Sequence, residues 1–186
     1  MSDLVCLIRP VLSVLSKFIK SIRCHQLVAI VSHHKAGKSH FINSIQSKNW
    51  LILDLEENVK MNLTENEKVH LNKFIGNSSF NIHYYPKCRE YLDDVEKNHK
   101  NKNIIVFCSD YDLVKYLKIK TVYCFAPSNN LSEMIKNNIQ DEDELKNYNE
   151  NRLKVILDAG SKLITFNSFD EFSQKLISKF KLQQKL

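Results

Sequence analysis

The sequence predicts a single α/β domain built around a parallel sheet, and three observations carry that prediction. Five short apolar runs, rich in isoleucine, valine and aromatic residues, alternate with segments of helical periodicity, as in parallel α/β proteins. A length of 186 residues is enough for one sizeable core. A glycine-lysine-serine sequence directly follows the first run. We expect one domain over residues 26–186, preceded by an extra N-terminal helix over residues 1–25.

The N-terminal segment has the pattern of an amphipathic helix. Residues 4–22 place apolar side chains at helical spacing, and the basic residues fall mostly off that stripe. Such a helix would pack on the sheet or on a partner subunit. The longest apolar runs of the chain are about five residues, whereas a membrane span needs roughly 20, so no membrane span is expected. A secretory signal is not expected, because the stretch lacks a long apolar centre.

The strands and several helix ends can be predicted in chain order. The five strand-like runs share short length and apolar character, and they are Leu27–Val31, Trp50–Leu55, Asn103–Cys108, Thr121–Phe125 and Lys162–Phe166. Thr64 with Glu67, and Ser168 with Glu171, have the spacing of a capping box that opens a helix. Gly160 suits the end of a long helix that starts near Asp141.

The net charge of +6 is concentrated at the two ends of the chain. Residues 1–25 and 172–186 hold eight of the 27 bases and one of the 21 acids, which leaves 19 bases and 20 acids between them. A nucleic-acid enzyme is expected to carry its basic residues around the active cleft, so the near-neutral body disfavours nucleic acid as a partner. We interpret the terminal bases as solvated helix faces, with a membrane or nucleic-acid contact as the alternative.

The cysteines point to the compartment. Five cysteines are scattered without C-x-x-C spacing, which predicts free thiols in a reducing compartment and hence a cytoplasmic protein. Two of the cysteines lie inside strand-like runs, where a buried thiol is expected. The pairs Cys24-His25 and His33-His34 fit no standard zinc spacing, so we expect no zinc site there.

The segment Ser32–Ser39 matches the phosphate-loop (Walker A) pattern G-x-x-x-x-G-K-[ST] at every defined position except the first glycine, which is Ser32. In this pattern backbone N–H groups wrap the β-phosphate, the lysine bridges the β- and γ-phosphates, and the hydroxyl binds Mg²⁺. We therefore expect a set of nucleotide-triphosphate-binding residues made of Ser32, His33, His34, Lys35, Ala36, Gly37, Lys38 and Ser39. Whether Ser32 is tolerated decides between a working phosphotransferase and a nucleotide binder.

Acids follow the second and third predicted strands, at the edge where parallel sheets bind ligands. Asp54 or Glu56 could accept the proton of a hydroxyl that attacks the γ-phosphate, and a solvated strand end is the alternative. Strand alternation places these two on one face and Glu57 on the other. Asp110 follows apolar residues, as in a Walker B sequence, where the acid reaches Mg²⁺ through water. Alternatively, Ser109 or Asp110 only caps the next helix.

Other polar residues are candidates for a lid and an acceptor pocket. Arg152 lies between the fourth and fifth predicted strands, where a lid would close over phosphates, and a surface arginine is the alternative. Four residues between the second and third strands could line an acceptor pocket or simply pack, namely Tyr84, Tyr85, Lys87 and Arg89.

These features together resemble P-loop NTPases of the kinase-like group, which includes nucleoside, nucleotide and shikimate kinases. The resemblance rests on Ser32–Ser39, on the acid ending the second strand, on Asp110 and on Arg152, and it covers residues 26–182. It implies a three-layer α/β/α fold with a five-stranded parallel sheet in the order 2-3-1-4-5. Compact kinase-like proteins of phages and large DNA viruses have similar layouts, which makes a viral source part of this expectation.

The resemblance also implies a function. An ATP-dependent small-molecule phosphotransferase is expected, most similar to a nucleoside or nucleotide kinase, with Lys38, Asp54 and Arg152 as catalytic residues. ATP and Mg²⁺ would be the cofactors, and Ser39 and Asp110 would hold the metal. A lid with one arginine favours an acceptor of low charge, such as a nucleoside. The alternative is a nucleotide-binding assembly protein or ATPase with weak or lost kinase activity, which forms homo-oligomers or binds a partner through its N-terminal helix.

Overall fold

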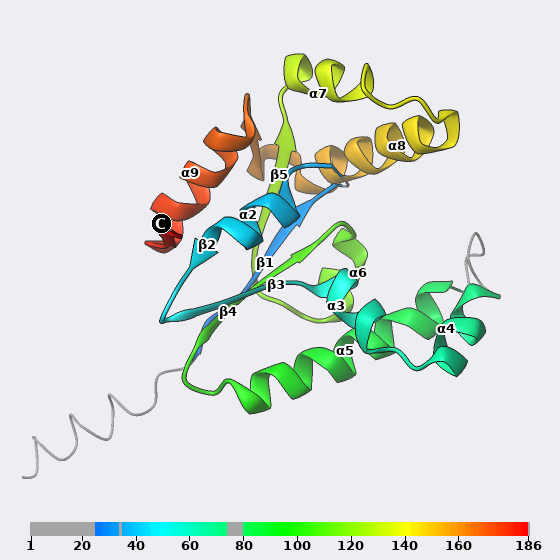
Figure 1. Ribbon diagram of the computed structural model, residues 1–186, viewed down its shortest axis with the longest axis vertical. Coiled ribbons are helices and arrows are strands. Elements are labelled where there is room, and N and C mark those ends of the chain that lie inside the picture. The colour runs from blue at the N-terminus through cyan, green and yellow to red at the C-terminus, as the bar shows by residue number, and fades with distance from the viewer. Residues whose placement is uncertain (1–24, 34, 74–79, 186) are drawn as a thin grey trace, which may run out of the picture.

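The computed structural model describes residues 25–33, 35–73 and 80–185. The helix expected over residues 1–25 and the loop residue His34 lie outside the described residues, except for His25. The described chain is an α/β domain, as expected, with a five-stranded parallel sheet at its centre (Figure 1). No helix in this part of the chain is both long enough and apolar enough to cross a membrane.

The five strands of the sheet lie close to the ranges expected for them. They are β1 (Leu27–Ser32), β3 (Trp50–Asp54), β4 (Asn103–Cys108), β5 (Thr121–Pro127) and β6 (Leu163–Phe166). Their order is β3-β4-β1-β5-β6, and every neighbouring pair is parallel. When these five strands alone are numbered along the chain, the order reads 2-3-1-4-5. An antiparallel ribbon of β2 (Ile45–Gln46) and β7 (Gln183–Gln184) was not expected.

Helices cover both faces of the sheet, so the domain has three layers. They are α2 (Lys38–Ser44), α3 (Leu55–Asn62), α4 (Glu65–Asn72), α5 (Phe80–Asn98), α6 (Tyr111–Tyr116), α7 (Asn129–Lys136), α8 (Glu142–Ala159) and α9 (Phe169–Phe180), and a 3₁₀ turn η1 (Gly160–Lys162) follows α8. One apolar cluster joins the sheet to α3, α5, α6 and α8, and a second joins the opposite face to α2, α7 and α9.

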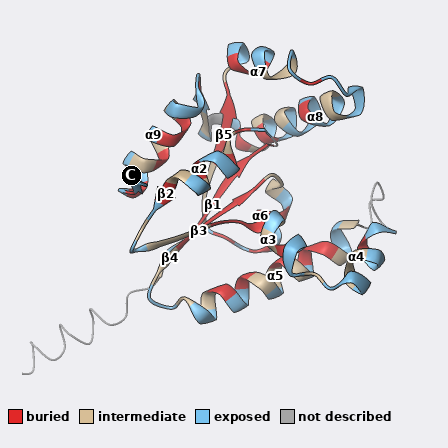
Figure 2. Cartoon of the chain, in the orientation of Figure 1, coloured by how far each residue is buried: buried red, intermediate tan, exposed pale blue. Residues whose placement is uncertain are grey.

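The central strand shows why both faces need cover. Val28 and Ile30 point into one cluster, Ala29 and Val31 into the other, and all four are fully buried. A continuous apolar run of this kind is typical of a parallel strand buried on both faces. In Figure 2, where buried residues are red, β1, β4 and β5 are red along much of their length.

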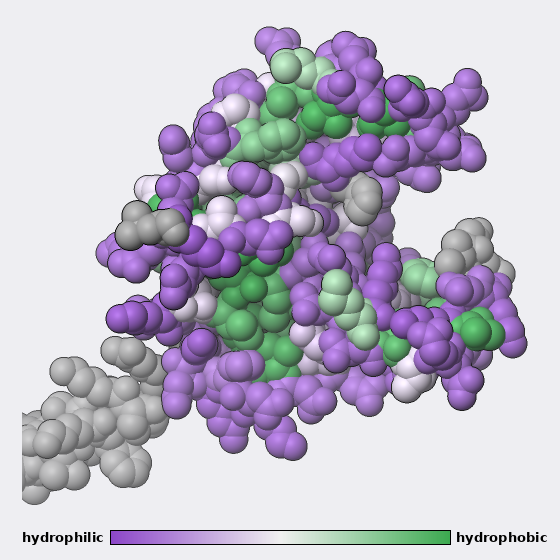
Figure 3. Space-filling model, viewed as in Figure 1, coloured by the Kyte–Doolittle hydropathy of each residue, from purple (hydrophilic) through white to green (hydrophobic). Residues whose placement is uncertain are grey.

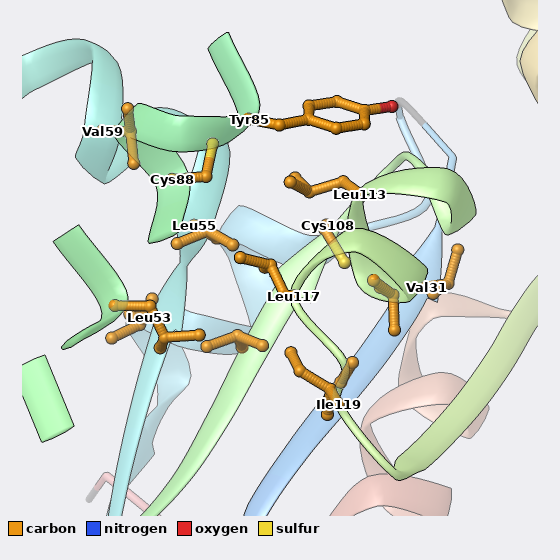
Figure 4. Packing of buried hydrophobic residues seen from close by; sticks show 14 of the residues in the cluster. Val31, Leu53, Leu55, Val59, Tyr85, Cys88, Cys108, Leu113, Leu117 and Ile119 are labelled. Carbon is orange, nitrogen blue, oxygen red and sulfur yellow. The ribbon is translucent and has the colours of Figure 1, made fainter. Parts of the chain in front are cut away.

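The first cluster packs side chains of α3, α5 and α6 onto the sheet. Figure 4 shows Leu55, Cys88 and Leu113, from three different helices, gathered over the strands that carry Val31 and Cys108. On the face seen in Figure 3, hydrophobic side chains gather in the middle and hydrophilic ones surround them.

Three of the expected helix ends can be compared with the structure. Thr64 accepts from the N–H of Glu67, and the Glu67 carboxylate accepts from the N–H of Thr64, so the capping box is complete. Ser168 also caps its helix, although the Glu171 carboxylate accepts from Asn167 and not from Ser168. Gly160 ends α8 with a positive φ of 51°, as expected.

Candidate functional site

The loop between β1 and α2 requires glycine at position 37 for two reasons. Gly37 caps α2 with φ 88° and ψ 11°, a left-handed conformation that side chains disfavour. A β-carbon built on Gly37 would lie 2.8 Å from Cδ1 of Phe169, the first residue of α9. The strand, the loop and the helix that starts at Lys38 thus occur in the order that the phosphate-loop pattern predicts.

Lys38 turns back into the loop. Its side chain is buried, and Nζ donates to the carbonyl oxygen of Ser32 at 3.3 Å and lies 4.0 Å from Oδ2 of Asp54. A buried ammonium group needs oxygen partners, because transfer of an unpaired charge out of water costs several kcal/mol. The carbonyl of Ser32 and the carboxylate of Asp54 therefore hold the ammonium group beside the loop.

The first part of the loop is packed into the protein. Ser32 is fully buried, and its Oγ has no hydrogen-bond partner among the described residues. His33 is also fully buried, and its ring lies edge-on to Tyr148 of α8 with centroids 4.9 Å apart. Ala36 is buried as well. These three residues shape the loop through its backbone, and their side chains are not available to a ligand from solvent.

The second part of the loop faces a cavity of about 690 Å³. Lys35, Gly37, Lys38 and Ser39 line it on one side. Asp54, Glu56, Glu57 and Lys60 line it from the end of β3 and from α3, and Phe169 lines it from α9. This volume lies within the range of small-molecule sites, and the cavity sits at the carboxyl edge of a parallel sheet, where such sites occur.

Lys35 joins the loop to the helix α8. It has a positive φ of 62°, and its Nζ forms an ion pair of 2.9 Å with Oε1 of Glu144. Both side chains are partly exposed, so this pair contributes at most about 1 kcal/mol. A phosphate in the cavity would compete with Glu144 for Lys35.

Asp54 has a structural part in the site. As the last residue of β3 it caps α3, accepting from the N–H of Glu57 at 3.1 Å, and its other oxygen faces Lys38. The sequence placed Asp54 and Glu56 on one face and Glu57 on the other, and this is wrong. The strand ends at Asp54 and α3 begins at Leu55, so strand alternation stops, and all three acids line the cavity.

Glu56 is the carboxylate that is held from outside its own helix. Its oxygens accept from the backbone N–H of Ser109 at 3.0 Å and from the Ser109 hydroxyl at 2.8 and 2.6 Å. Glu56 and Lys60 line the loop cavity, and both also line a neighbouring cavity of about 230 Å³. Glu56 therefore lies where the two cavities meet.

Asp110 lies one strand away from the loop and is engaged by other groups. It caps α6 through the N–H of Asp112, and Oδ1 lies 2.9 Å from Nζ of Lys154. The Tyr85 hydroxyl donates to its other oxygen, and burial together with this bond raises the pKa of Tyr85. Asp110 lines the smaller cavity and is absent from the lining of the loop cavity. The geometry thus shows the capping role, and the metal role, which is compatible with it, stays a prediction.

Arg152 lies on α8 and points to the junction of β5 and α7. Its Nη2 donates to the carbonyl oxygen of Pro127 at 3.1 Å and to Oδ1 of Asn129 at 2.8 Å. The residue does not line the loop cavity. In this structure Arg152 ties α8 to the sheet, and its role in a lid stays a prediction.

The smaller cavity includes two of the four residues suggested for an acceptor pocket. Tyr84 and Tyr85 line it together with Phe80, and burial raises the pKa of both tyrosines. The other two residues face elsewhere: Lys87 pairs with Glu67 at 2.7 Å, and Arg89 donates to the carbonyl oxygen of Leu117. Sequence spacing could not separate the two pairs, because all four residues lie on one helix, α5.

Two residues of the loop cavity could contribute to a magnesium site. Among the residues that the structure describes, no group of three or more histidine, cysteine, aspartate or glutamate side chains is placed so that it could hold a metal ion by itself. Mg²⁺ bound with nucleotides needs only one or two protein groups besides phosphates. The Ser39 hydroxyl and the Asp54 carboxylate line the same cavity and fit that requirement, whereas Asp110 does not line it.

Comparisons with known proteins do not place the chain in a family. No protein-family model matches the sequence, and a search of curated proteins finds no match.

Proposed function

We propose that the protein binds a nucleoside triphosphate at the loop between β1 and α2 and transfers its γ-phosphate to a small hydroxyl-bearing acceptor. One observation carries the proposal. A left-handed Gly37 and a buried Lys38 join a central parallel strand to a helix, and they open onto a cavity of about 690 Å³ that carboxylates line on the other side.

On the donor side, Lys38 would hold the β- and γ-phosphates together with the backbone N–H groups of the loop. The structure records no acceptor among the described residues for the N–H groups of Lys38 and Ser39, as expected for the first turn of a helix. Lys35 would add a second cation at the rim of the cavity. Mg²⁺, held by Ser39 and Asp54, would neutralise phosphate charge when bound.

On the acceptor side, the contacts favour Glu56 over Asp54 as the group that orients the hydroxyl. Asp54 caps α3 with one oxygen and faces Lys38, on the donor side of the cavity, with the other. Glu56 is fixed by Ser109 and lies between the donor cavity and the smaller aromatic cavity. A carboxylate at that position can accept the proton of a hydroxyl as it attacks the phosphate.

The smaller cavity limits the size and charge of the acceptor. Its volume is about 230 Å³, and Phe80, Tyr84 and Tyr85 supply flat apolar surface. Glu56 and Asp110 bring two carboxylates and Lys60 one ammonium. A neutral hydroxylated molecule fits this lining better than one that already carries a phosphate, because the acids would repel it.

Binding of ATP with and without Mg²⁺, measured by calorimetry and thermal shift, tests the donor site. Lys38→Ala should abolish the ATP-dependent rise in melting temperature, because a ligand stabilises a protein only to the extent that it binds the folded state. The matched control is Lys48→Ala, which removes the same charge from an exposed lysine before β3. Unchanged ATP binding by Lys38→Ala would refute the proposed donor site.

A second candidate function is nucleotide binding without phosphate transfer, as in an ATPase or an assembly protein. Two observations favour it: the first glycine of the loop pattern is a buried serine, and Arg152 is tied to Pro127 and Asn129, away from the cavity. ATP binding without phosphate transfer to any nucleoside, nucleotide or sugar would support this function. Deletion of residues 1–22 followed by size measurement tests assembly through the N-terminal segment.

A reducing, cytoplasmic compartment is part of the proposal. Cys88, Cys108 and Cys124 are free and buried, which suits a protein that does not rely on disulfides. Burial raises the pKa of Cys88 to about 12, so its thiol is unreactive near neutral pH.

A further inference from the structure

A cavity larger than the loop cavity lies at the amino ends of the strands, opposite the phosphate loop. It has a volume of about 950 Å³. Its lining comes from His25 and Gln26 before β1, from the start of β3, from the turn before β4 and from the end of α9. In Figure 1, β1 runs from this end of the sheet to the phosphate loop at the other. This cavity and the loop cavity share no lining residue.

This cavity is strongly basic. Lys100, Lys102, Lys179 and Lys181 line it, and no aspartate or glutamate does. Within the described residues, none of these four lysines takes part in a recorded ion pair. Glu96 lies close by, but it is held by His25 at 3.2 Å. Four ammonium groups around one hollow, with no acid in its lining, attract a ligand with several negative charges.

Aromatic rings and amides also line the cavity. Trp50 and Tyr123 are partly buried beside the buried Phe180, and the Trp50 and Phe180 rings lie 5.2 Å apart. Nζ of Lys179 lies 4.1 Å above the Tyr123 ring, so Trp50 is the ring on which a base would stack. Three asparagines and one glutamine complete the lining. Lysines that follow a phosphate backbone, with rings and amides for the bases, are the usual features of single-strand binding sites.

We propose that this basic cavity, lined by Lys100, Lys102, Lys179 and Lys181 around Trp50, binds single-stranded nucleic acid. A lipid surface fits less well, because none of the strongly exposed large apolar side chains of the described residues lines the cavity. Such a surface would need apolar groups that can enter the bilayer. The site is separate from the phosphate loop, so it does not depend on the proposed phosphotransfer.

Trp50 gives a direct readout, because it is the only tryptophan in the 186-residue chain. A labelled single-stranded oligonucleotide of about 20 nucleotides should raise fluorescence anisotropy on binding and quench Trp50 by base stacking. Inorganic polyphosphate should compete with the oligonucleotide without quenching Trp50, because it has no bases. Tighter binding of a duplex with unchanged Trp50 fluorescence would overturn a single-strand site.

Charge reversal tests the lysines. The double variant Lys102→Glu with Lys179→Glu should weaken oligonucleotide binding at least tenfold. The slope of log K against log salt concentration should also become shallower by about 1.4, because each of the two lost phosphate contacts contributes about 0.7. The matched control reverses two exposed lysines, Lys73 after α4 and Lys146 on α8, in elements that contribute nothing to the cavity. That control should keep affinity within about twofold, because only the long-range field changes.

Three outcomes would overturn the proposal. They are no oligonucleotide binding at low salt, equal losses in the two double variants, and binding of anionic phospholipid vesicles in place of the oligonucleotide. Lys38→Ala separates this site from the donor site, because it should lose ATP binding and keep oligonucleotide binding. If the wild-type protein binds the oligonucleotide but not ATP, the proposed phosphotransferase fails and the proposed nucleic-acid site stands. If it binds ATP but not the oligonucleotide, the nucleic-acid site fails and the donor site stands.

Discussion

Charged side chains behave differently at the carboxyl edge of the sheet and on the outer helices α4 and α5. At the edge, Lys38 and Asp54 are buried, and Glu56 and Asp110 are fixed by partners from other elements. On the outer helices, Lys87 pairs with Glu67 and Glu90 in solvent. Buried charges persist only where several contacts hold them, and that is the arrangement a ligand site needs. The expected effects of mutation therefore decrease from the edge outward.

The largest combined effect on folding and on ATP binding is expected from Gly37→Ala. Alanine at φ 88° costs about 1–2 kcal/mol, and its β-carbon would collide with Phe169. The loop must shift, so we expect ATP affinity to fall at least about tenfold, as measured by calorimetry. Gly160→Ala is the control, since its φ is also positive but its β-carbon would meet nothing within 4 Å.

Gly160→Ala should lower the melting temperature and leave ATP affinity unchanged. Adding Phe169→Ala to Gly37→Ala should recover part of the lost stability, because it removes the collision and keeps the backbone strain. Equal ATP affinities for Gly37→Ala and the wild type would show that the edge is not a phosphate site.

The next effect concerns turnover. Glu56→Gln should lower kcat by roughly 10²–10⁴ and leave ATP affinity unchanged, because a general base acts on the acceptor proton. Glu57→Gln, in the same cavity but exposed and not held by Ser109, should keep most of the activity. Steady-state kinetics with a panel of nucleoside acceptors provides the measurement. A similar loss in both variants would assign the effect to cavity charge and not to Glu56.

An intermediate effect is expected from Arg152→Ala, because Arg152 lies on an outer helix, α8, but contacts the end of β5. The effect should be on stability. Two hydrogen bonds from its guanidinium to Pro127 and Asn129 would be lost, at a cost of about 1–2 kcal/mol in unfolding free energy. Denaturant unfolding measures this cost, and the KM for ATP should stay unchanged. A raised KM with unchanged stability would instead support the lid role that the resemblance implies.

Much of the fold was predictable from the sequence, because apolar runs with strand length and capping residues are local signals. The strand Asn103–Cys108 and the complete capping box at Thr64 are examples. The ribbon of β2 and β7 was not predictable, since two-residue strands pair Ile45 with Gln184 across almost the whole chain. Such a contact leaves no periodic pattern.

The candidate site was predictable in its loop and less so in its carboxylates and arginine. Lys38 and Gly37 follow from a motif whose geometry is local. The choice between Asp54 and Glu56 depends on where β3 ends and on Ser109, 53 residues from Glu56. The direction of the Arg152 side chain depends on how α8 is rotated about its axis. Contacts with distant residues such as Pro127 fix that rotation. The near-neutral total of residues 26–171 likewise gave no sign that Lys100 and Lys102 lie beside the C-terminal lysines, because charge counts ignore position.

The smallest effect is expected on the outer helices, from Glu67→Gln. The hydrogen bond from Lys87 and the bond from Thr64 lower the pKa of Glu67 from 4.5 to about 2. Between these pH values the unfolded chain binds more protons than the folded one, so this carboxylate stabilises the fold above pH 4.5 and its contribution is lost as the pH falls toward 2. Urea unfolding across this range should show a shallower loss for Glu67→Gln than for the wild type. Glu65→Gln, exposed on the same helix turn and paired with the neighbouring Lys68 of its own helix, should follow the wild-type curve. If Glu67→Gln also follows it, the ion pair between α4 and α5 does not contribute to stability, and the contrast with the carboxyl edge becomes sharper.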